Sequence, residues 1–224
     1  MSTHRTTITG QHTTTVVARE DLAPTAYVLR LDRGGLAFVP GQCVILGIAG
    51  GRDQREYSIY SPIAAATLDV LIREVEGGKV SRQLRRCAPG VEVTIEGPVG
   101  FFTLDDVVPS RDEVLFVATG TGIAPFHCMA GSMVGLNYRV LHGVRAASEA
   151  FGRATFDRAR HVLCASREAA GDFAGRVTDY LRAHPVNPRV RCYLCGNARM
   201  IDEAYDILAQ QGVPADNIRA EVYF

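Results

Sequence analysis

The sequence has very little lysine, no long apolar segment and no closely spaced set of cysteines. Lys79 is the only lysine, so arginine carries nearly all the positive charge of this 224-residue chain, whose formal net charge is zero. A balanced charge gives no general attraction to nucleic acid or to an anionic membrane. No apolar run approaches the length that spans a bilayer, and the opening segment MSTHRTTITGQHTTT lacks the apolar core of a signal peptide. We therefore expect a cytoplasmic protein with neither nucleic acid nor membrane as a partner, and a monomer.

The cysteines are scattered rather than grouped. Several of them lie inside apolar, strand-like segments, which is typical of reduced, buried thiols and not of a disulfide framework. Cys192 and Cys195 form one C-x-x-C, but a zinc site would need a second pair and an iron–sulfur centre would need a tighter cluster. We expect no metal. The six cysteines are Cys43, Cys87, Cys128, Cys164, Cys192 and Cys195.

The first half of the chain is rich in β-branched residues, and glycine and proline separate its short segments. Short strands at this spacing are typical of a small antiparallel β-barrel. We therefore predict a barrel domain over residues 1–106, with one helix that begins near Lys79. The predicted strands are 12–19, 26–32, 43–49, 56–60, 68–75 and 91–96.

The second half alternates apolar strands with helical patterns. This alternation predicts right-handed crossovers and a parallel sheet with helices on both faces. We therefore predict an α/β domain over residues 107–224, joined to the barrel by a linker near 105–112. The predicted strands are 113–118, 138–144, 161–166, 189–196 and 217–223, and the predicted helices are 123–134, 173–183 and 198–210.

Two glycine-rich turns are candidate phosphate sites. In VLFVATGTGIAPF, Gly120 and Gly122 lie between a strand and a helix, where the backbone can approach a pyrophosphate, although glycine at such a turn can also serve packing alone. In GGKVSRQL, glycines lead into a helix whose first turn contains Ser81, and Arg55 could supply a matching cation. Two such sites predict two bound nucleotides.

Several arginines follow the later strands of the second half. Arg145 ends the second strand, Ser166 and Arg167 end the third, and Arg176 comes shortly after. The arginine fork suits a 2′-phosphate, which favours NADPH over NADH. The alternative is that these are solvated arginines on loops.

The segment REYSIYSP, residues 55–62, alternates poorly for a strand and crowds polar groups beside two tyrosines. It is either an exposed edge strand or a surface that holds a flat, charged ligand.

The motifs REYS, GKVS, GTGIAP, CGNARM and the ending EVYF, in this order, resemble the ferredoxin–NADP reductase superfamily. GFFTLDD, SRE and the ending AEVYF most resemble the bacterial ferredoxin/flavodoxin–NADP(+) reductases. The resemblance implies FAD in the barrel and NADP(H) in the second domain. It implies that NADPH delivers a hydride to FAD, whose electrons then pass singly to a separate ferredoxin or flavodoxin.

The resemblance also implies the roles of individual residues. Arg55 would pair with the FAD pyrophosphate, Tyr57 would pack on the flavin, Thr121 would contact both cofactors and Tyr223 would stack on the flavin ring. The implied catalytic residues are Ser58, Cys195, Glu221 and Tyr223. The implied cofactor contacts are Arg55, Glu56, Tyr57, Ser58, Ile72, Arg73, Glu74, Gly78, Lys79, Val80, Ser81, Gly120, Thr121, Gly122, Arg145, Ser166, Arg167, Arg176, Gly196, Asn197, Met200, Tyr223 and Phe224.

The carrier and the exact activity stay open at this point. Lys79, Arg82, Arg85 and Arg86 form a possible docking face for an acidic carrier, or a solvated helix face. The segment IYSP after REYS is more like oxygenase reductases than like the bacterial ferredoxin reductases. The alternatives are an NADH-dependent reductase component of an oxygenase, a free-flavin reductase, and a non-catalytic flavin-binding regulatory subunit.

Overall fold

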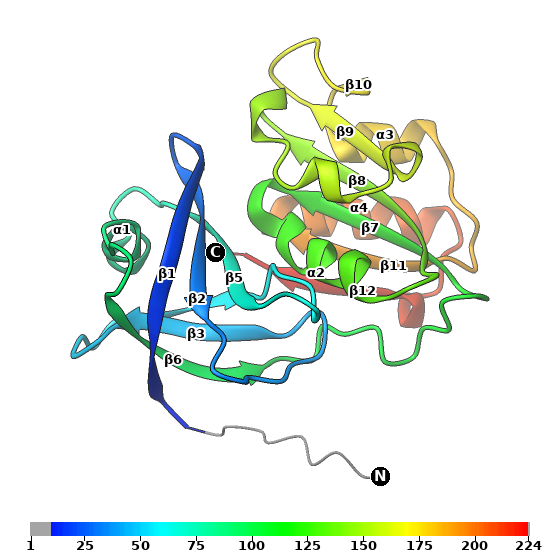
Figure 1. Ribbon diagram of the computed structural model, residues 1–224. Coiled ribbons are helices and arrows are strands. Elements are labelled where there is room, and N and C mark those ends of the chain that lie inside the picture. Colours follow the sequence, from blue (N-terminus) through cyan, green and yellow to red (C-terminus); the bar gives the residue numbers. More distant parts are fainter. Residues whose placement is uncertain (1–9, 224) are drawn as a thin grey trace, which may run out of the picture. The chain divides into compact units, whose positions relative to one another are not determined.

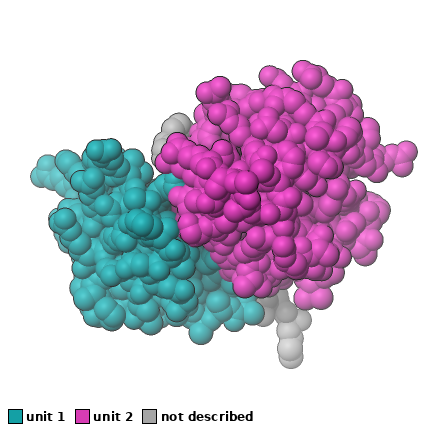
Figure 2. Space-filling view, turned by 90° about the horizontal axis from the view of Figure 1, so that it is seen from above, with its two compact units in different colours: residues 1–103 teal, residues 104–224 magenta. Residues whose placement is uncertain are grey.

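The computed structural model describes residues 10–223. The chain divides into two compact units, unit 1 (Met1–Thr103) and unit 2 (Leu104–Phe224), which Figure 2 colours separately. Each unit contains one six-stranded sheet. The assignment of a cofactor to residues 1–106 and another to residues 107–224 stays a prediction.

Unit 1 is an antiparallel sheet with the strand order β4-β3-β6-β1-β2-β5 and one short helix, α1 (Figure 1). Its inner side is filled by aliphatic side chains such as Leu29, Leu46, Leu68 and Ile95, all at most 2% exposed. Its elements are β1 (His12–Ala23), β2 (Ala26–Asp32), β3 (Cys43–Ile48), β4 (Gln54–Ser58), β5 (Thr67–Arg73), α1 (Lys79–Arg85) and β6 (Glu92–Val99).

The predicted barrel is not fully closed. The end strands β4 and β5 are joined by a single bridge between Ile59 and Val70 rather than by a ladder. Beyond the bridge, the Ser61 hydroxyl accepts the Asp69 N–H at 2.9 Å, and Pro62 has no N–H to donate. The ladder therefore stops where the chain turns, and the unit is a strongly curved, open sheet.

Unit 2 is a parallel sheet with the strand order β10-β9-β8-β7-β11-β12. Strands added after β7 go first to one side, as β8 to β10, and then to the other, as β11 and β12. The order therefore reverses between β7 and β11. Its main elements are β7 (Glu113–Thr119), α2 (Ala124–Ser132), β8 (Asn137–Val144), β9 (His161–Ala165), β10 (Phe173–Ala174), α3 (Val177–Ala183), β11 (Arg191–Gly196), α4 (Ala198–Gln210) and β12 (Ile218–Val222).

The helices of unit 2 cover both faces of the sheet. Right-handed crossovers that run in opposite directions along a sheet put their helices on opposite faces. Accordingly, α2 lies on one face and α3 and α4 lie on the other (Figure 1). The α2 face is aromatic, with the Phe116 and Phe126 rings stacked at 4.5 Å. The α3 and α4 face is aliphatic, with Leu194, Leu208 and Ala204 at 0% exposure.

Most predicted elements are confirmed, but several of their boundaries differ. The strand predicted at 12–19 continues to Ala23, the strand predicted at 56–60 is Gln54–Ser58, and the helix predicted at 123–134 is Ala124–Ser132. The strand at 26–32 and the helix at 198–210 have the predicted ends. The helix predicted at 173–183 begins only at Val177, because Phe173 and Ala174 pair with β9 as the edge strand β10. Within the described part of the chain, no helix has both the length and the apolar character needed to cross a membrane.

Candidate functional site

The carboxyl edge of the unit 2 sheet brings together two turns that are far apart in the sequence. β7 leads from Thr119 into a 3₁₀ turn, η1 (Gly120–Ile123), and β11 leads into α4 through Asn197. The Thr119 hydroxyl accepts hydrogen bonds from the Asn197 backbone N–H at 3.2 Å and from its side-chain amide at 3.0 Å. In open α/β sheets, nucleotides bind outside the strand ends where the strand order reverses. The structure thus brings together the predicted nucleotide residues Gly120, Thr121, Gly122, Gly196 and Asn197.

Glycines make the close approach of these two turns possible. A Cβ on Gly122 would lie 2.7 Å from the carbonyl carbon of Cys195, and a Cβ on Gly196 would overlap the Thr119 hydroxyl. Gly120 is required for another reason, because its φ of 54° is in the left-handed region. Packing between the turns therefore accounts for Gly122, and the same packing presents a bare backbone at the strand ends.

The last strand covers the end of β11. β12 pairs Glu221 with Cys195, and the Tyr223 N–H donates to the Gly196 carbonyl at 2.8 Å. Cys195 is fully buried, and burial raises the pKa of its thiol well above the usual range, with Glu221 adding to the rise and a hydrogen bond with Tyr223 opposing it. A thiol that stays protonated is a poor nucleophile. Cys195, Glu221 and Tyr223 lie together here, and the predicted Phe224 lies outside the described residues.

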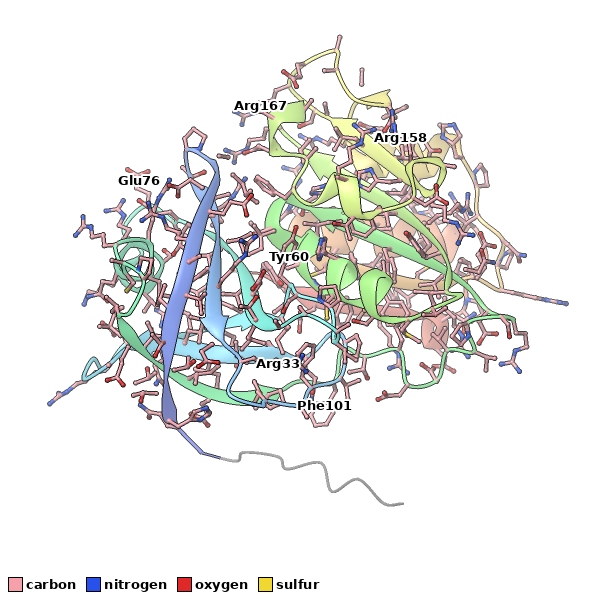
Figure 3. The ribbon with its side chains drawn as sticks, in the orientation of Figure 1. Arg33, Tyr60, Glu76, Phe101, Arg158 and Arg167 are labelled. Carbon is pink, nitrogen blue, oxygen red and sulfur yellow. The ribbon has the colours of Figure 1, made fainter. Side chains whose placement is uncertain are left out.

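The predicted 2′-phosphate residues follow neighbouring strands, and so reach this same edge. Arg145 comes after β8 and Arg167 after β9, and both are exposed (Figure 3 labels Arg167). The Ser166 hydroxyl donates to the Val144 carbonyl at 3.1 Å. Arg176 is also exposed and is the residue that precedes α3, where its N–H donates to the Asp179 carboxylate at 3.0 Å.

Two carboxylates lie on the same loops as these arginines. The Glu149 carboxylate accepts the Arg145 N–H at 3.1 Å, and the Glu168 carboxylate accepts the Ala147 N–H. The first bond lies within the loop after β8, and the second ties that loop to the loop after β9. An acidic side chain after the second strand of such a sheet can take the ribose 2′-hydroxyl of an NAD-type nucleotide. The edge therefore offers groups for a 2′-phosphate and for a 2′-hydroxyl.

In unit 1, the segment REYS forms β4, which is the end strand of the sheet. Arg55 and Tyr57 are two residues apart, so their side chains leave the same face of the strand. Arg55 is exposed, Tyr57 is half-buried, and burial raises the pKa of the Tyr57 hydroxyl to about 12. Ser58 points to the other face and is 5% exposed. An edge strand with a guanidinium beside a half-buried ring fits a flat, anionic ligand.

The second glycine-rich turn is held in place from β2. The Gly78 N–H donates to the Val75 carbonyl at 2.9 Å, and the Val75 N–H donates to the Ser81 hydroxyl at 3.4 Å. The buried Tyr27 hydroxyl donates to the Ser81 carbonyl at 2.5 Å. The start of α1 therefore has a defined conformation. Ile72 and Val80 are buried beside it, so only their backbone could meet a ligand.

The cations of α1 are not equally available to a partner. Arg85 forms ion pairs with Asp21 and Glu74, each at 3.2 Å, and its side chain is 22% exposed. Arg82 forms a longer ion pair with Glu74, at 3.5 Å, and its side chain is 44% exposed. Lys79 lies 3.8 Å from Asp53 and is 78% exposed. Arg85 is therefore mainly a structural residue, which separates it from the other members of the predicted docking face.

Comparison with known proteins identifies the superfamily. Residues 13–104 match the family model for the oxidoreductase FAD-binding domain. The chain is 32% identical to ferredoxin–NADP reductase B of Sorangium cellulosum, and the match covers 93% of this chain and 96% of that protein. The chain belongs to the ferredoxin–NADP reductase superfamily. It is a flavoprotein oxidoreductase with an FAD-binding domain.

Other members of the superfamily that match are parts of oxygenase systems. The chain is 31% identical to the toluate 1,2-dioxygenase electron transfer component of Pseudomonas putida, over 84% of this chain, and spans 59% of that protein. It is also 31% identical to the ferredoxin–NAD(+) reductase component of an alkene monooxygenase system from Xanthobacter autotrophicus, over 93% of this chain and 68% of that protein.

A solved structure confirms the fold of this chain. The ferredoxin NADP+ reductase of Neisseria gonorrhoeae, crystallised with FAD and NADP, superposes with a TM-score of 0.84. The match covers 96% of this chain and 99% of that one at 20% identity, so the likeness establishes the two-unit architecture alone.

The sequence patterns missed three residues that shape these turns: Tyr27, Thr119 and His142. Tyr27 donates a hydrogen bond to the Ser81 carbonyl, and Thr119 accepts one from Asn197. His142 contacts the η1 turn from inside the sheet, with Nε2 2.9 Å from the Gly120 carbonyl oxygen. The one available signal was a polar side chain inside an otherwise apolar strand, as in YRVLHGV.

Proposed function

We propose that this protein is a ferredoxin/flavodoxin–NADP(+) reductase that exchanges electrons between NADP(H) and a separate one-electron carrier. The observation that carries the proposal is the reversal of strand order at β7 and β11, with Arg145 and Arg167 exposed on the same edge. The similarity to a ferredoxin–NADP reductase over 96% of that protein's length supports it.

Unit 1 would hold the FAD. Arg55 supplies the cation for the pyrophosphate, Tyr57 lies on the same face of β4 as a surface for the ring, and Ser58 supplies a buried hydroxyl. The Gly78–Ser81 turn supplies backbone N–H groups at the start of α1. Bound FAD supplies the conversion between transfer of an electron pair as hydride and transfer of single electrons. The remaining contacts proposed for FAD in this unit are Glu56, Ile72, Arg73, Glu74, Lys79 and Val80.

Unit 2 would hold the nucleotide at its carboxyl edge. The η1 turn and Asn197 would lie against the diphosphate, and Arg145 and Arg167 would pair with the 2′-phosphate. Tyr223 covers the end of β11 through its bond to Gly196, so it would have to move for the nicotinamide to reach Cys195. Cys195 would orient the nicotinamide by contact, because its protonated thiol is a poor nucleophile. The remaining residues proposed here are Ser166, Arg176 and Met200.

A separate acidic carrier would dock by charge. Lys79 and Arg82 on α1 and Arg86 directly after it are exposed, and complementary charge raises the rate of such encounters. Charge reversal at Arg82 and Arg86 is expected to slow reduction of the carrier strongly at low salt and little at high salt. If the rate of carrier reduction depends on salt in the variant as it does in wild type, α1 is not part of the docking face.

A second candidate is an NADH-dependent reductase component of an oxygenase system. Glu149 and Glu168 favour it, because their carboxylates could take a ribose 2′-hydroxyl and would repel a 2′-phosphate. The oxygenase components among the relatives support it as well.

An anaerobic titration of the purified holoprotein with NADPH, and separately with NADH, tests both candidates. Flavin absorbance that bleaches with stoichiometric NADPH, and far more slowly with NADH, supports the first. A preference for NADH supports the second, and a flavin that neither nucleotide bleaches refutes both. Turnover of added FMN without any carrier would indicate a free-flavin reductase instead.

Variants at the carboxyl edge of the unit 2 sheet test, in the same titration, which residues choose between NADPH and NADH. Arg167→Gln is expected to lower the preference for NADPH, and Glu168→Gln to raise it, by about tenfold each. Arg189→Gln removes an exposed arginine that precedes β11, far in the chain from these loops, and is the matched control. Equal preferences in all three variants would refute the assignment of these loops to the 2′ position.

A further inference from the structure

A histidine inside the unit 2 sheet contacts the turn proposed to bind the nucleotide. His142 lies on β8 between β7 and β9, with 0% exposure. Its Nε2 is 2.9 Å from the Gly120 carbonyl oxygen, at the first residue of η1. Because a carbonyl oxygen can only accept, Nε2 must carry the proton and donate it. The geometry therefore selects one tautomer of this imidazole.

The ring stays neutral in this position. Burial is the main cause that lowers the pKa of His142, to about 3, and the bond to Gly120 opposes the shift. The other ring nitrogen, Nδ1, has no hydrogen-bond partner among the residues that the structure describes. An apolar side chain of similar size would avoid this buried, unsatisfied nitrogen. The bond from Nε2 is the physical reason for a histidine at this position.

The bond fixes the direction of a peptide group at the strand end. Gly120 has a φ of 54° and no side chain, so its local conformation has little intrinsic restraint. The Gly120–Thr121 peptide is trans, and in a trans peptide the C=O and N–H groups point in opposite directions. A Gly120 carbonyl held toward the buried imidazole therefore directs the Thr121 N–H away from the interior.

We propose that His142 is a positioning residue for the nucleotide, because its Nε2–H holds the Gly120 carbonyl inward and leaves the Thr121 N–H for the diphosphate. A flipped peptide would replace a donor by a carbonyl oxygen, which repels a phosphate. The inference rests on the proposed function, since it assumes that a dinucleotide diphosphate binds at η1.

A neighbouring histidine provides the matched control. His161 lies on β9, is 2% exposed and is 5.9 Å from His142 between ring centroids. Its ring stacks on Phe156 at 5.3 Å, and neither ring nitrogen has a hydrogen-bond partner among the described residues. It shares the burial of His142 and has no bond to the turn. Replacement of His161 by Phe should therefore leave nucleotide binding unchanged.

The test is calorimetric titration of the holoprotein with NADP+, and separately with NAD+, for wild type, His142→Phe, His142→Gln and His161→Phe. The Kd of the preferred nucleotide should rise about tenfold in H142F, which keeps a ring but lacks the donor. H142Q carries an amide N–H that can replace Nε2–H, so it should recover part of the affinity, and H161F should match wild type. In turnover, H142F should raise KM for the nucleotide more than it lowers kcat.

Nitrogen-15 NMR of the histidine side chains gives a readout without nucleotide. The proposal expects a neutral His142 with its proton on Nε2; a proton on Nδ1 would overturn it, even if H142F fails to fold. If H142F binds the nucleotide with the same Kd as wild type, the positioning role is overturned and the proposed function is not. Wild type that binds neither nucleotide would overturn the proposed function, and the positioning role with it.

Discussion

Replacement of Arg85 by methionine should destabilise unit 1 much more than the same change at Arg82. Both arginines lie on α1 and pair with Glu74, but only Arg85 also pairs with Asp21, donates to the Pro24 carbonyl at 2.6 Å and lies 5.6 Å from the Tyr27 ring centroid. Methionine keeps the stem of the side chain and removes the guanidinium, so the comparison isolates the polar contacts.

The magnitude follows from these contacts. The half-exposed ion pair of Arg82 contributes at most about 0.5 kcal/mol. Arg85 adds a charged hydrogen bond of about 1.5 kcal/mol, a cation–π contact of about 0.5 kcal/mol and ion pairs in a more buried place. We expect Arg85→Met to cost about 2–3 kcal/mol of the free energy of unfolding, since such terms are not fully additive.

The assay is urea denaturation of the holoprotein, followed by far-UV circular dichroism and by the fluorescence of released flavin. Arg82→Met should shift the midpoint little, and Arg85→Met should lower it clearly for both signals. Equal midpoints for the two variants would refute the structural role of Arg85. If Arg85→Met loses carrier reduction but keeps its stability, Arg85 contacts the carrier and is part of the docking face.

Three further changes have expected outcomes. Gly122→Ala should cost about 2–3 kcal/mol and abolish nucleotide binding, because its Cβ would overlap the Cys195 carbonyl; normal stability in thermal unfolding would contradict the packing of the two turns. Tyr27→Phe should cost about 1 kcal/mol and weaken FAD retention on dilution, because the Ser81 carbonyl loses its donor; unchanged retention would show that the turn is held otherwise. The hydrogen bond from Arg158 is the main cause that lowers the pKa of the Asp172 carboxyl below its usual range, and Arg153 adds to the shift. The ionised carboxylate therefore stabilises the fold above the unfolded pKa of about 3.9, and this stabilisation is lost as the pH falls below that value. Asp172→Asn should therefore lower stability by about 1–2 kcal/mol at pH 7 and by much less near pH 2, and a pH-independent difference would contradict this.

Local patterns were sufficient for most elements. The helix Ala198–Gln210 could be placed from the sequence because its apolar residues recur at helical spacing and Asn197 caps its start. The strand Ala26–Asp32 was clear from its run of apolar residues between turn signals. The edge strand Phe173–Ala174 was not, because so short a segment becomes a strand only through its pairing with β9.

The sequence by itself determined the alternation of strands and helices, the glycine-rich turns and the order of motifs that marks a ferredoxin–NADP reductase relative. The tertiary structure decided which distant groups meet. Sheet order alone places Asn197 against Thr119, and burial alone gives His142 its contact with the Gly120 carbonyl. It likewise decided that Arg85 serves the fold, because its partners Asp21 and Glu74 are brought to it by strand pairing. Such contacts depend on register and burial, which no local pattern encodes.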